Sequence, residues 1–180
     1  KTINRRKQTN MEDTSIIVGI DLGTTYSAIA YLDEYGKASI IPNTDNERIT
    51  PSVVLFHENE TIVGKIAQEE ASSDPENVVQ YIKRDMGNAE WERTIFQKKY
   101  TPETISACII QHLVQDAKQY LQKDIHKAVL TVPAYFGERE RKATQTAGEL
   151  AGLTILGIIN EPTAAAIAYG LNQNNQDHKV

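Results

Sequence analysis

From Thr101 onward, helical and strand-like patterns alternate along the chain, and this alternation constrains the fold more than any other feature. The clearest segment is a helix expected at Thr101–Lys123, with Thr101 as N-cap, Pro102 in the first turn and Glu103 near the positive end. Its apolar residues recur at helical spacing: Ile105, Cys108, Ile109, Leu113, Ala117 and Leu121. This stripe predicts that the helix packs on a sheet and that Cys108 is a buried, reduced thiol.

The remaining elements are expected from apolar runs and turn residues. Downstream of the long helix we expect a strand at 128–132, a helix at 138–151, a strand at 155–159 and an Ala-rich helix at 162–169 that ends at Gly170. Small side chains at 164–166 would let that last helix lie close to a sheet. Upstream we expect an antiparallel meander of strands at 16–20, 27–32 and 38–41, strands at 52–56 and 61–63, and helices at 65–70 and 77–85. The stretch 87–100 shows no clear period.

Composition excludes several classes of function. Hydrophobic residues make up 40% of the chain and charged residues 24%, as in ordinary globular proteins, and the net charge is −5. Without a basic cluster, nucleic acid is not expected as a partner. No apolar run reaches the roughly 20 residues of a membrane helix, so no membrane association is expected. A single cysteine fits a reducing compartment, and we expect a cytoplasmic location.

Asp21-Leu22-Gly23-Thr24-Thr25 forms a turn directly after a strand, and it is the first segment whose residues suggest chemistry. Gly23 would let backbone N–H groups approach a phosphate, and the two threonines would add hydroxyl donors. Asp21 offers a carboxylate for a hydrated Mg²⁺. From these residues alone, a plain hairpin capped by Asp21 explains the pattern equally well.

Four segments, in order, resemble the heat shock protein 70 family of DnaK-type molecular chaperones. They are Val18–Ser27, Ile49–Val54, Val129–Phe136 and Ile158–Gly170. The last, with Asn-Glu-Pro-Thr-Ala-Ala-Ala, is the most specific. The resemblance covers residues 16–171 and implies the N-terminal part of an ATPase domain. The implied fold class is α/β, a ribonuclease-H-like, actin-like ATPase lobe with a small inserted α+β subdomain.

The resemblance also implies roles for individual residues in binding ATP or ADP with Mg²⁺. Lys83 would act near the γ-phosphate, although alone it suggests only a solvated helix charge. Glu161 would join Asp21 as a ligand to water on Mg²⁺; its alternative is a charge that favours a helix N-terminus. Gly23, Thr24 and Thr25 would contact phosphates.

Three further residues match positions beside the nucleotide or in the family's switch. Tyr26 would lie next to the nucleotide, and core packing is an equal alternative. Pro133 and Arg141 match the pair that transmits the nucleotide state. For Arg141 the alternative is a surface ion pair with Glu138 or Glu140.

The sequence departs from the family pattern in three places. The stretch 86–100, which follows Lys83 closely, is shorter than usual. Gly157 replaces a common arginine on the face linked to J-domain co-chaperones, so that docking is in question. Gly137 replaces an asparagine at the expected start of a helix, where glycine can still cap.

The sequence thus predicts a tail at 1–15, a lobe core at 16–50 and 101–171, a shortened inserted subdomain at 51–100 and a linker at 172–180 to a second lobe. The predicted function is the first lobe of an ATP-dependent folding chaperone that couples ATP hydrolysis to binding of client proteins. Unfolded client peptides would bind through further domains, and a J-domain co-chaperone and a nucleotide exchange factor are expected partners.

Two other functions fit the same residues. One is a non-catalytic module that binds co-chaperones or partner lobes without ATP turnover. The other is a small-molecule kinase of the same superfamily, against which the segment 160–170 argues. The isolated chain is expected to hydrolyse ATP barely or not at all.

Overall fold

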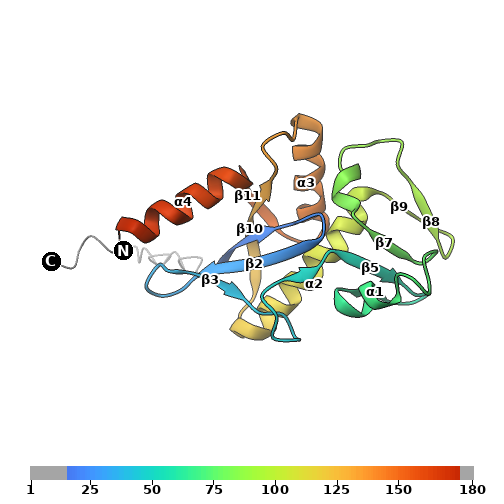
Figure 1. The fold of residues 1–180 in the computed structure, drawn as a ribbon, viewed down its shortest axis with the longest axis horizontal. Coiled ribbons are helices and arrows are strands. Elements are labelled where there is room, and N and C mark those ends of the chain that lie inside the picture. The colour runs from blue at the N-terminus through green and yellow to red at the C-terminus, as the bar shows by residue number, and fades with distance from the viewer. Residues whose placement is uncertain (1–15, 175–180) are drawn as a thin grey trace, which may run out of the picture.

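The computed structural model describes residues 16–174 and has a six-stranded sheet at its centre (Figure 1). The expected tail at 1–15 and the last part of the expected linker, 175–180, lie outside the described residues. Strands β1 (Ile16–Asp21), β2 (Tyr26–Leu32) and β3 (Ala38–Ile41) form the antiparallel meander that the sequence predicts. The short β4 (Thr50–Pro51) pairs with the start of β2.

The sheet continues through two parallel strands on the other side of β1. Its order is β11-β10-β1-β2-β3, where β10 is Ile125–Val132 and β11 is Thr154–Asn160. Both β1–β10 and β10–β11 are parallel pairs, so these three strands end at one edge. Both later strands begin earlier than the sequence pattern suggested, because pairing in the sheet extends them beyond their apolar runs.

Two helices cover one face of the sheet. Helix α2 (Pro102–Leu121) begins with a capping box, in which Thr101 and Thr104 exchange side-chain and backbone hydrogen bonds. Its residues Ile105, Ile109 and Leu113 are buried in the main core, as predicted. Helix α3 (Glu138–Leu150) packs beside α2 and ends before Gly152, whose φ of +87° suits glycine.

Cys108 is only half-buried, which corrects the expectation of a buried thiol. It lies at the margin of the α2 stripe, and its thiol donates to the Thr104 carbonyl at 3.4 Å. Partial burial still raises the pKa of Cys108 above its usual range.

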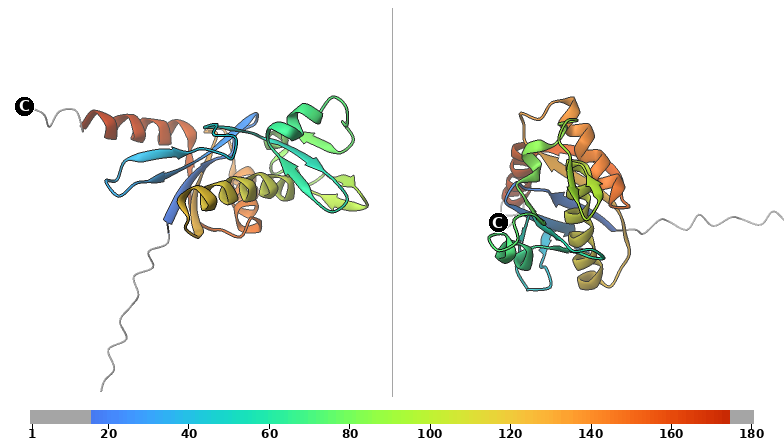
Figure 2. Two further views of the ribbon diagram at one scale, coloured as in Figure 1. Left: turned by 90° about the horizontal axis from the view of Figure 1, so that it is seen from below. Right: turned by 90° about the vertical axis from the view of Figure 1, so that its right-hand side faces the viewer.

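The stretch between β4 and α2 forms two smaller sheets beside the central one (Figure 2). The first contains β5 (Val53–Phe56), β6 (Thr61–Val63) and β7 (Val78–Gln80), with α1 (Lys65–Glu70) between β6 and β7. The second is the hairpin of β8 (Arg93–Ile95) and β9 (Lys98–Tyr100), in the stretch that the sequence left unassigned. Phe56 and Ile95 belong to the main core, so this stretch shares much of its interior with the central sheet. The subdomain boundaries stay a prediction.

The helix expected at 77–85 is wrong. Val78 and Val79 instead pair with β5, because pairing with a distant strand outweighs the local helical pattern. The chain then turns at Tyr81, which has a left-handed φ of +59°, into a 3₁₀ helix, η1 (Ile82–Asp85). A bulky residue with positive φ is strained, and this conformation turns the chain so that Lys83 becomes buried.

The last helix, α4 (Glu161–Asn174), continues through Gly170, where the sequence predicted its end. Glycine costs only about 1 kcal/mol in a helix interior, so alone it is a weak terminator. Helix α4 extends away from the sheet, on the side opposite the two smaller sheets (Figures 1 and 2). Ala165 and Ala166 are exposed, so within the described residues the alanine run is not packed as expected.

Candidate functional site

The candidate residues gather at the edge of the sheet where β1, β10 and β11 end. Asp21 is the last residue of β1 and aligns with Thr131 of β10, which in turn aligns with Ile159 of β11. Glu161 follows β11 and opens α4. Asp21 and Glu161 therefore do not end adjacent strands, since β10 lies between β1 and β11. Their strands are two spacings apart, about 10 Å, at the same edge.

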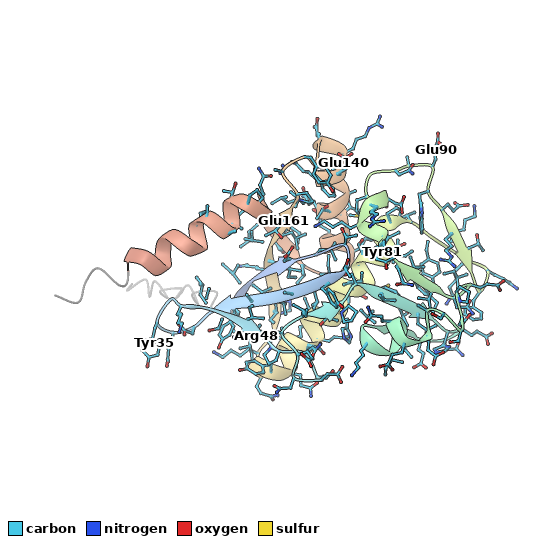
Figure 3. All side chains as sticks on the ribbon, in the orientation of Figure 1. Tyr35, Arg48, Tyr81, Glu90, Glu140 and Glu161 are labelled. Atoms are coloured by element: carbon cyan, nitrogen blue, oxygen red, sulfur yellow. The ribbon has the colours of Figure 1, made fainter. Side chains whose placement is uncertain are left out.

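Lys83 and Glu161 form an ion pair at this edge. The ammonium Nζ donates to Glu161 Oε1 at 2.6 Å, with side-chain exposures of 7% and 37% respectively. Figure 3 labels Glu161 at the beginning of α4 and Tyr81 just before η1. Lys83 is thus not a solvated helix charge: it is buried and its charge is balanced by a carboxylate.

Phe136 connects this ion pair to the two residues expected to form the switch. Its ring centroid lies 5.9 Å from Lys83 Nζ, its N–H donates to the Pro133 carbonyl at 3.1 Å, and its carbonyl accepts from Arg141 Nε at 3.0 Å. Arg141 also donates to Asn160 Oδ1, next to Glu161. Among the described residues Arg141 forms no ion pair with Glu138 or Glu140, so that alternative is excluded.

Asp21 is exposed at the end of β1, and its Oδ1 accepts a hydrogen bond from Thr131 Oγ1 at 2.8 Å. This bond fixes the orientation of the carboxylate between the two parallel strands. A carboxylate accepts several hydrogen bonds or ligands, so Asp21 keeps capacity for a further group in solvent.

Gly23 is required by close packing and not by an unusual φ angle. A Cβ at this position would lie 1.8 Å from the Tyr26 carbonyl oxygen, and φ is not in the left-handed region. The N–H of Gly23 donates to Ser27 Oγ at 3.1 Å, and Ser27 Oγ lies 2.9 Å from Ser52 Oγ in the interior. The hairpin is therefore built around a buried serine pair.

The other hairpin residues face outward. Thr24 is half-buried, Thr25 is exposed and Tyr26 is 45% exposed, so Tyr26 does not fill the core. Thr24 and Thr25 line a small pocket together with residues of β5, α1 and β7 and with two loop residues: Val53, Gln68, Gln80, Ser52 and Tyr81. Thr25 and Tyr26 are thus the parts of the hairpin that are open to solvent.

These donors suit a hydrated magnesium ion better than a direct protein cage. Within residues 16–174, no group of three or more His, Cys, Asp or Glu side chains could hold a metal ion. Mg²⁺ commonly keeps several waters and binds one or two carboxylates together with substrate phosphates. One exposed carboxylate at Asp21 and a second, partly exposed carboxylate at Glu161 fit that pattern.

Comparison with known proteins identifies the family. The sequence model described as "Hsp70 protein" matches residues 17–97 and 89–180. The chaperone protein DnaK of Thermotoga neapolitana is 48% identical over 170 residues, which cover 94% of this chain and 28% of that protein. This chain belongs to the Hsp70 family. The DnaK proteins of Thermotoga petrophila and Thermotoga sp. strain RQ2 show the same identity and coverage.

Within the Hsp70 family this chain corresponds to the N-terminal part of the ATPase domain. The predicted fold class, an α/β lobe of the actin-like type, is confirmed. The chain spans 28% of the length of the DnaK relatives that it matches. No helix among residues 16–174 is long and apolar enough to cross a membrane.

Sequence reasoning did not single out three residues that complete the site. Thr131 donates a hydrogen bond to Asp21, and the ring of Phe136 lies beside Lys83. Asn160 accepts a hydrogen bond from Arg141. Thr131 and Phe136 lie in Val129–Phe136, and Asn160 lies in Ile158–Gly170. The motifs therefore contained the signal, but only the register of β1, β10 and β11 brings these residues together.

Proposed function

We propose that this chain binds Mg·ATP at the carboxyl edge of its central sheet, as one wall of an Hsp70 nucleotide site. The observation that carries the proposal is the buried Lys83–Glu161 pair at the same edge as Asp21. Folded proteins rarely bury an ammonium group, because removing its charge from water costs free energy. A buried lysine therefore indicates a specific role for its charge.

The proposed chemistry is in-line attack of water on the γ-phosphate. Lys83 would stabilise charge on the transferring group, and Glu161 holds its ammonium in position. Asp21 and Glu161 would bind waters of the magnesium ion, while Gly23, Thr24 and Thr25 would contact phosphates and Tyr26 would flank the nucleotide. Magnesium, when bound, would neutralise phosphate charge.

The proposed switch is the contact chain from Pro133 through Phe136 and Arg141 to Asn160. A change in what Glu161 binds would alter the position of its neighbour Asn160, and Arg141 would report that change to α3. In the whole protein this would couple hydrolysis to client binding and to co-chaperones. This proposal also includes the predicted domain boundaries, the cytoplasmic location, and three kinds of partner: client peptides, a J-domain co-chaperone and a nucleotide exchange factor.

A chimera provides the test of catalysis. This chain would replace the corresponding 170 residues of Thermotoga neapolitana DnaK, and ATP turnover would be measured. Lys83→Ala should lower kcat by about 100-fold or more with little change in ATP affinity, because its interaction strengthens in the transition state. Arg84→Ala is the matched control, since Arg84 is exposed and stacks on Tyr81 at 5.0 Å. Equal effects of the two substitutions would contradict the role of Lys83.

The isolated chain should bind Mg·ATP weakly and hydrolyse it barely or not at all. One wall of a cleft leaves the triphosphate in water, where electrostatic stabilisation is weak. Turnover at the rate of a whole chaperone, abolished by Asp21→Asn, would contradict this expectation.

A non-catalytic role in binding a partner is the second candidate. It is favoured by the exposed alternate residues of β1, Ile17, Gly19 and Asp21, and by Ile167 of α4, which is 53% exposed. A chimera that folds and binds ATP but never hydrolyses it would favour this candidate over the first.

A further inference from the structure

Two buried serines join the hairpin of residues 22–25 to the junction between β4 and β5. Ser27 of β2 is 1% exposed, and Ser52, which lies between β4 and β5, is 2% exposed. Their hydroxyl oxygens lie 2.9 Å apart, so that one hydroxyl donates to the other. The two residues are 25 positions apart in the chain, and the pair therefore links two separate segments.

Two other buried polar side chains outside the candidate site contact residues of their own helix. Asp116 Oδ2 lies 3.5 Å from His112 Nε2 on α2, and Thr144 Oγ1 donates to the Glu140 carbonyl on α3 at 2.8 Å. The serine pair differs because it lies between segments. Replacing both partners of a buried hydrogen bond by apolar groups of the same shape is often nearly neutral, so stability alone does not account for the pair.

Ser52 holds the hairpin at two points. Its backbone N–H donates to the Thr25 carbonyl at 2.8 Å. Its side chain acts through Ser27, whose Oγ accepts the Gly23 N–H at 3.1 Å. A shift of Ser52 would therefore move both Gly23 and Thr25 or break one of these bonds.

Ser52 also lies next to the segment that leads to Lys83. The adjacent Val53 pairs with Gln80, the last residue of β7. Tyr81 follows, begins the turn into η1 and lines the same small pocket as Ser52 and the hairpin; Figure 3 labels it. Ser52 thus lies where the hairpin meets the strand that leads to Lys83.

We propose that Ser52 is a positioning residue that fixes the hairpin of residues 23–25 relative to Lys83. It acts on one side of the hairpin through Ser27 and on the other through its own backbone. That this spacing matters for ATP rests on the proposed function, in which the hairpin contacts phosphates and Lys83 stabilises the transferring group.

Amide exchange in the 180-residue chain tests the positioning role. In Ser52→Ala the Gly23 amide should exchange about 3- to 10-fold faster, because Ser27 loses the bond that holds its hydroxyl in place. Ser106→Ala is the matched control, since Ser106 is buried on α2 and donates to Met86 Sδ at 3.4 Å. It should leave exchange at Gly23 unchanged.

A double-substitution cycle shows whether the two serines act as one unit. Ser27→Ala removes the direct acceptor of the Gly23 N–H, so adding Ser52→Ala should accelerate exchange by less than about twofold more. The Leu153 amide, bonded to the Gly148 carbonyl at 3.2 Å, reports general destabilisation and should stay unchanged.

Three results would overturn the proposal. They are unchanged exchange at Gly23 in Ser52→Ala, a parallel acceleration at Leu153, and additive effects of the two serine substitutions. The first would show that Ser27 keeps its place without a partner, the second that the loss is general, and the third that the serines act separately.

Kinetics of the DnaK chimera separate positioning from a contribution to stability. Ser52→Ala should lower kcat about 5- to 20-fold and change KM for ATP by less than about threefold, because a small displacement between the hairpin and Lys83 costs more in the transition state than in binding. Ser106→Ala should change neither constant. Equal losses of kcat in the two variants would contradict the positioning role.

The two experiments also distinguish this proposal from the proposed function. If the unaltered chimera does not bind Mg·ATP, the proposed nucleotide site fails. Exchange at Gly23 in the 180-residue chain then still decides whether Ser52 positions the hairpin, since that measurement needs no nucleotide.

Discussion

Lys83 and Glu161 form an ion pair at 2.6 Å although 78 positions separate them in the chain. Lys83 comes from η1, just after the strained Tyr81, and Glu161 is the first residue of α4. The pair therefore fixes the smaller sheets to the central one and presents a charge at the candidate site.

The two partners should contribute unequally to stability. Glu161→Gln leaves the Lys83 ammonium buried without a counter-charge and should lower the free energy of unfolding by about 1–3 kcal/mol. Lys83→Met removes the buried charge, keeps similar volume and should cost less, because Glu161 is 37% exposed and can be hydrated. Urea unfolding of both variants measures the difference. A larger loss for Lys83→Met would show that the lysine is not held by this pair.

Gly23 and Gly19 form a matched pair for testing the hairpin. Gly23→Ala should destabilise the chain by about 1–3 kcal/mol, since the new Cβ would collide with the Tyr26 carbonyl. Gly19→Ala, where nothing lies within 4 Å, should change stability by less than about 1 kcal/mol. Thermal unfolding monitored by circular dichroism suffices. Similar effects at both positions would argue against the tight turn.

Asp116 should give the chain a distinctive dependence of stability on pH. Its pKa in the folded chain is raised, chiefly by burial, so the fold favours the protonated carboxyl. The unfolded chain, with an aspartate pKa of about 3.9, ionises first as pH rises. From about pH 4 upward, the unaltered chain should therefore lose unfolding free energy relative to Asp116→Asn. A shift in the opposite direction would show that the Asp116–His112 attraction outweighs burial.

Cys108 should react slowly with a thiol reagent at pH 7. It is half-buried and its pKa is raised by that burial, so little reactive thiolate is present. Because it is the single cysteine, absorbance of the released thiol product reports this site alone. Unfolding in urea should accelerate labelling strongly, and equal rates in the two states would show that α2 does not protect it.

Local signals in the sequence predicted much of the fold. The Thr101 cap, the proline after it and the apolar stripe fixed the limits of α2 to within two residues. The β1–β3 meander and the helix at 65–70 were likewise predicted from turns and short periodic runs. In each of these elements, the residues that decide the structure are neighbours in the chain.

Predictions failed where distant segments decide the structure. Val78 and Val79 became a strand because β5 pairs with them, and Lys83 became buried because Glu161 lies opposite. The order of strands in the sheet, with β10 between β1 and β11, is equally non-local. Motif resemblance found most of the candidate residues, but only coordinates could show that Phe136 links Lys83 to Arg141.

The parallel pairing of β1 with β10 also has a consequence for biosynthesis. The bond between Asp21 and Thr131 spans 110 positions, so at about 5–20 residues per second a ribosome needs roughly 5 to 20 s to add the second partner after the first. During that interval the nascent β1–β2–β3 meander has an unpaired strand edge at β1, next to the exposed Ile17. The nascent chain is therefore at risk of aggregation until β10 emerges and pairs with β1. Slowing translation just before residue 125 should lower the soluble yield of the chain.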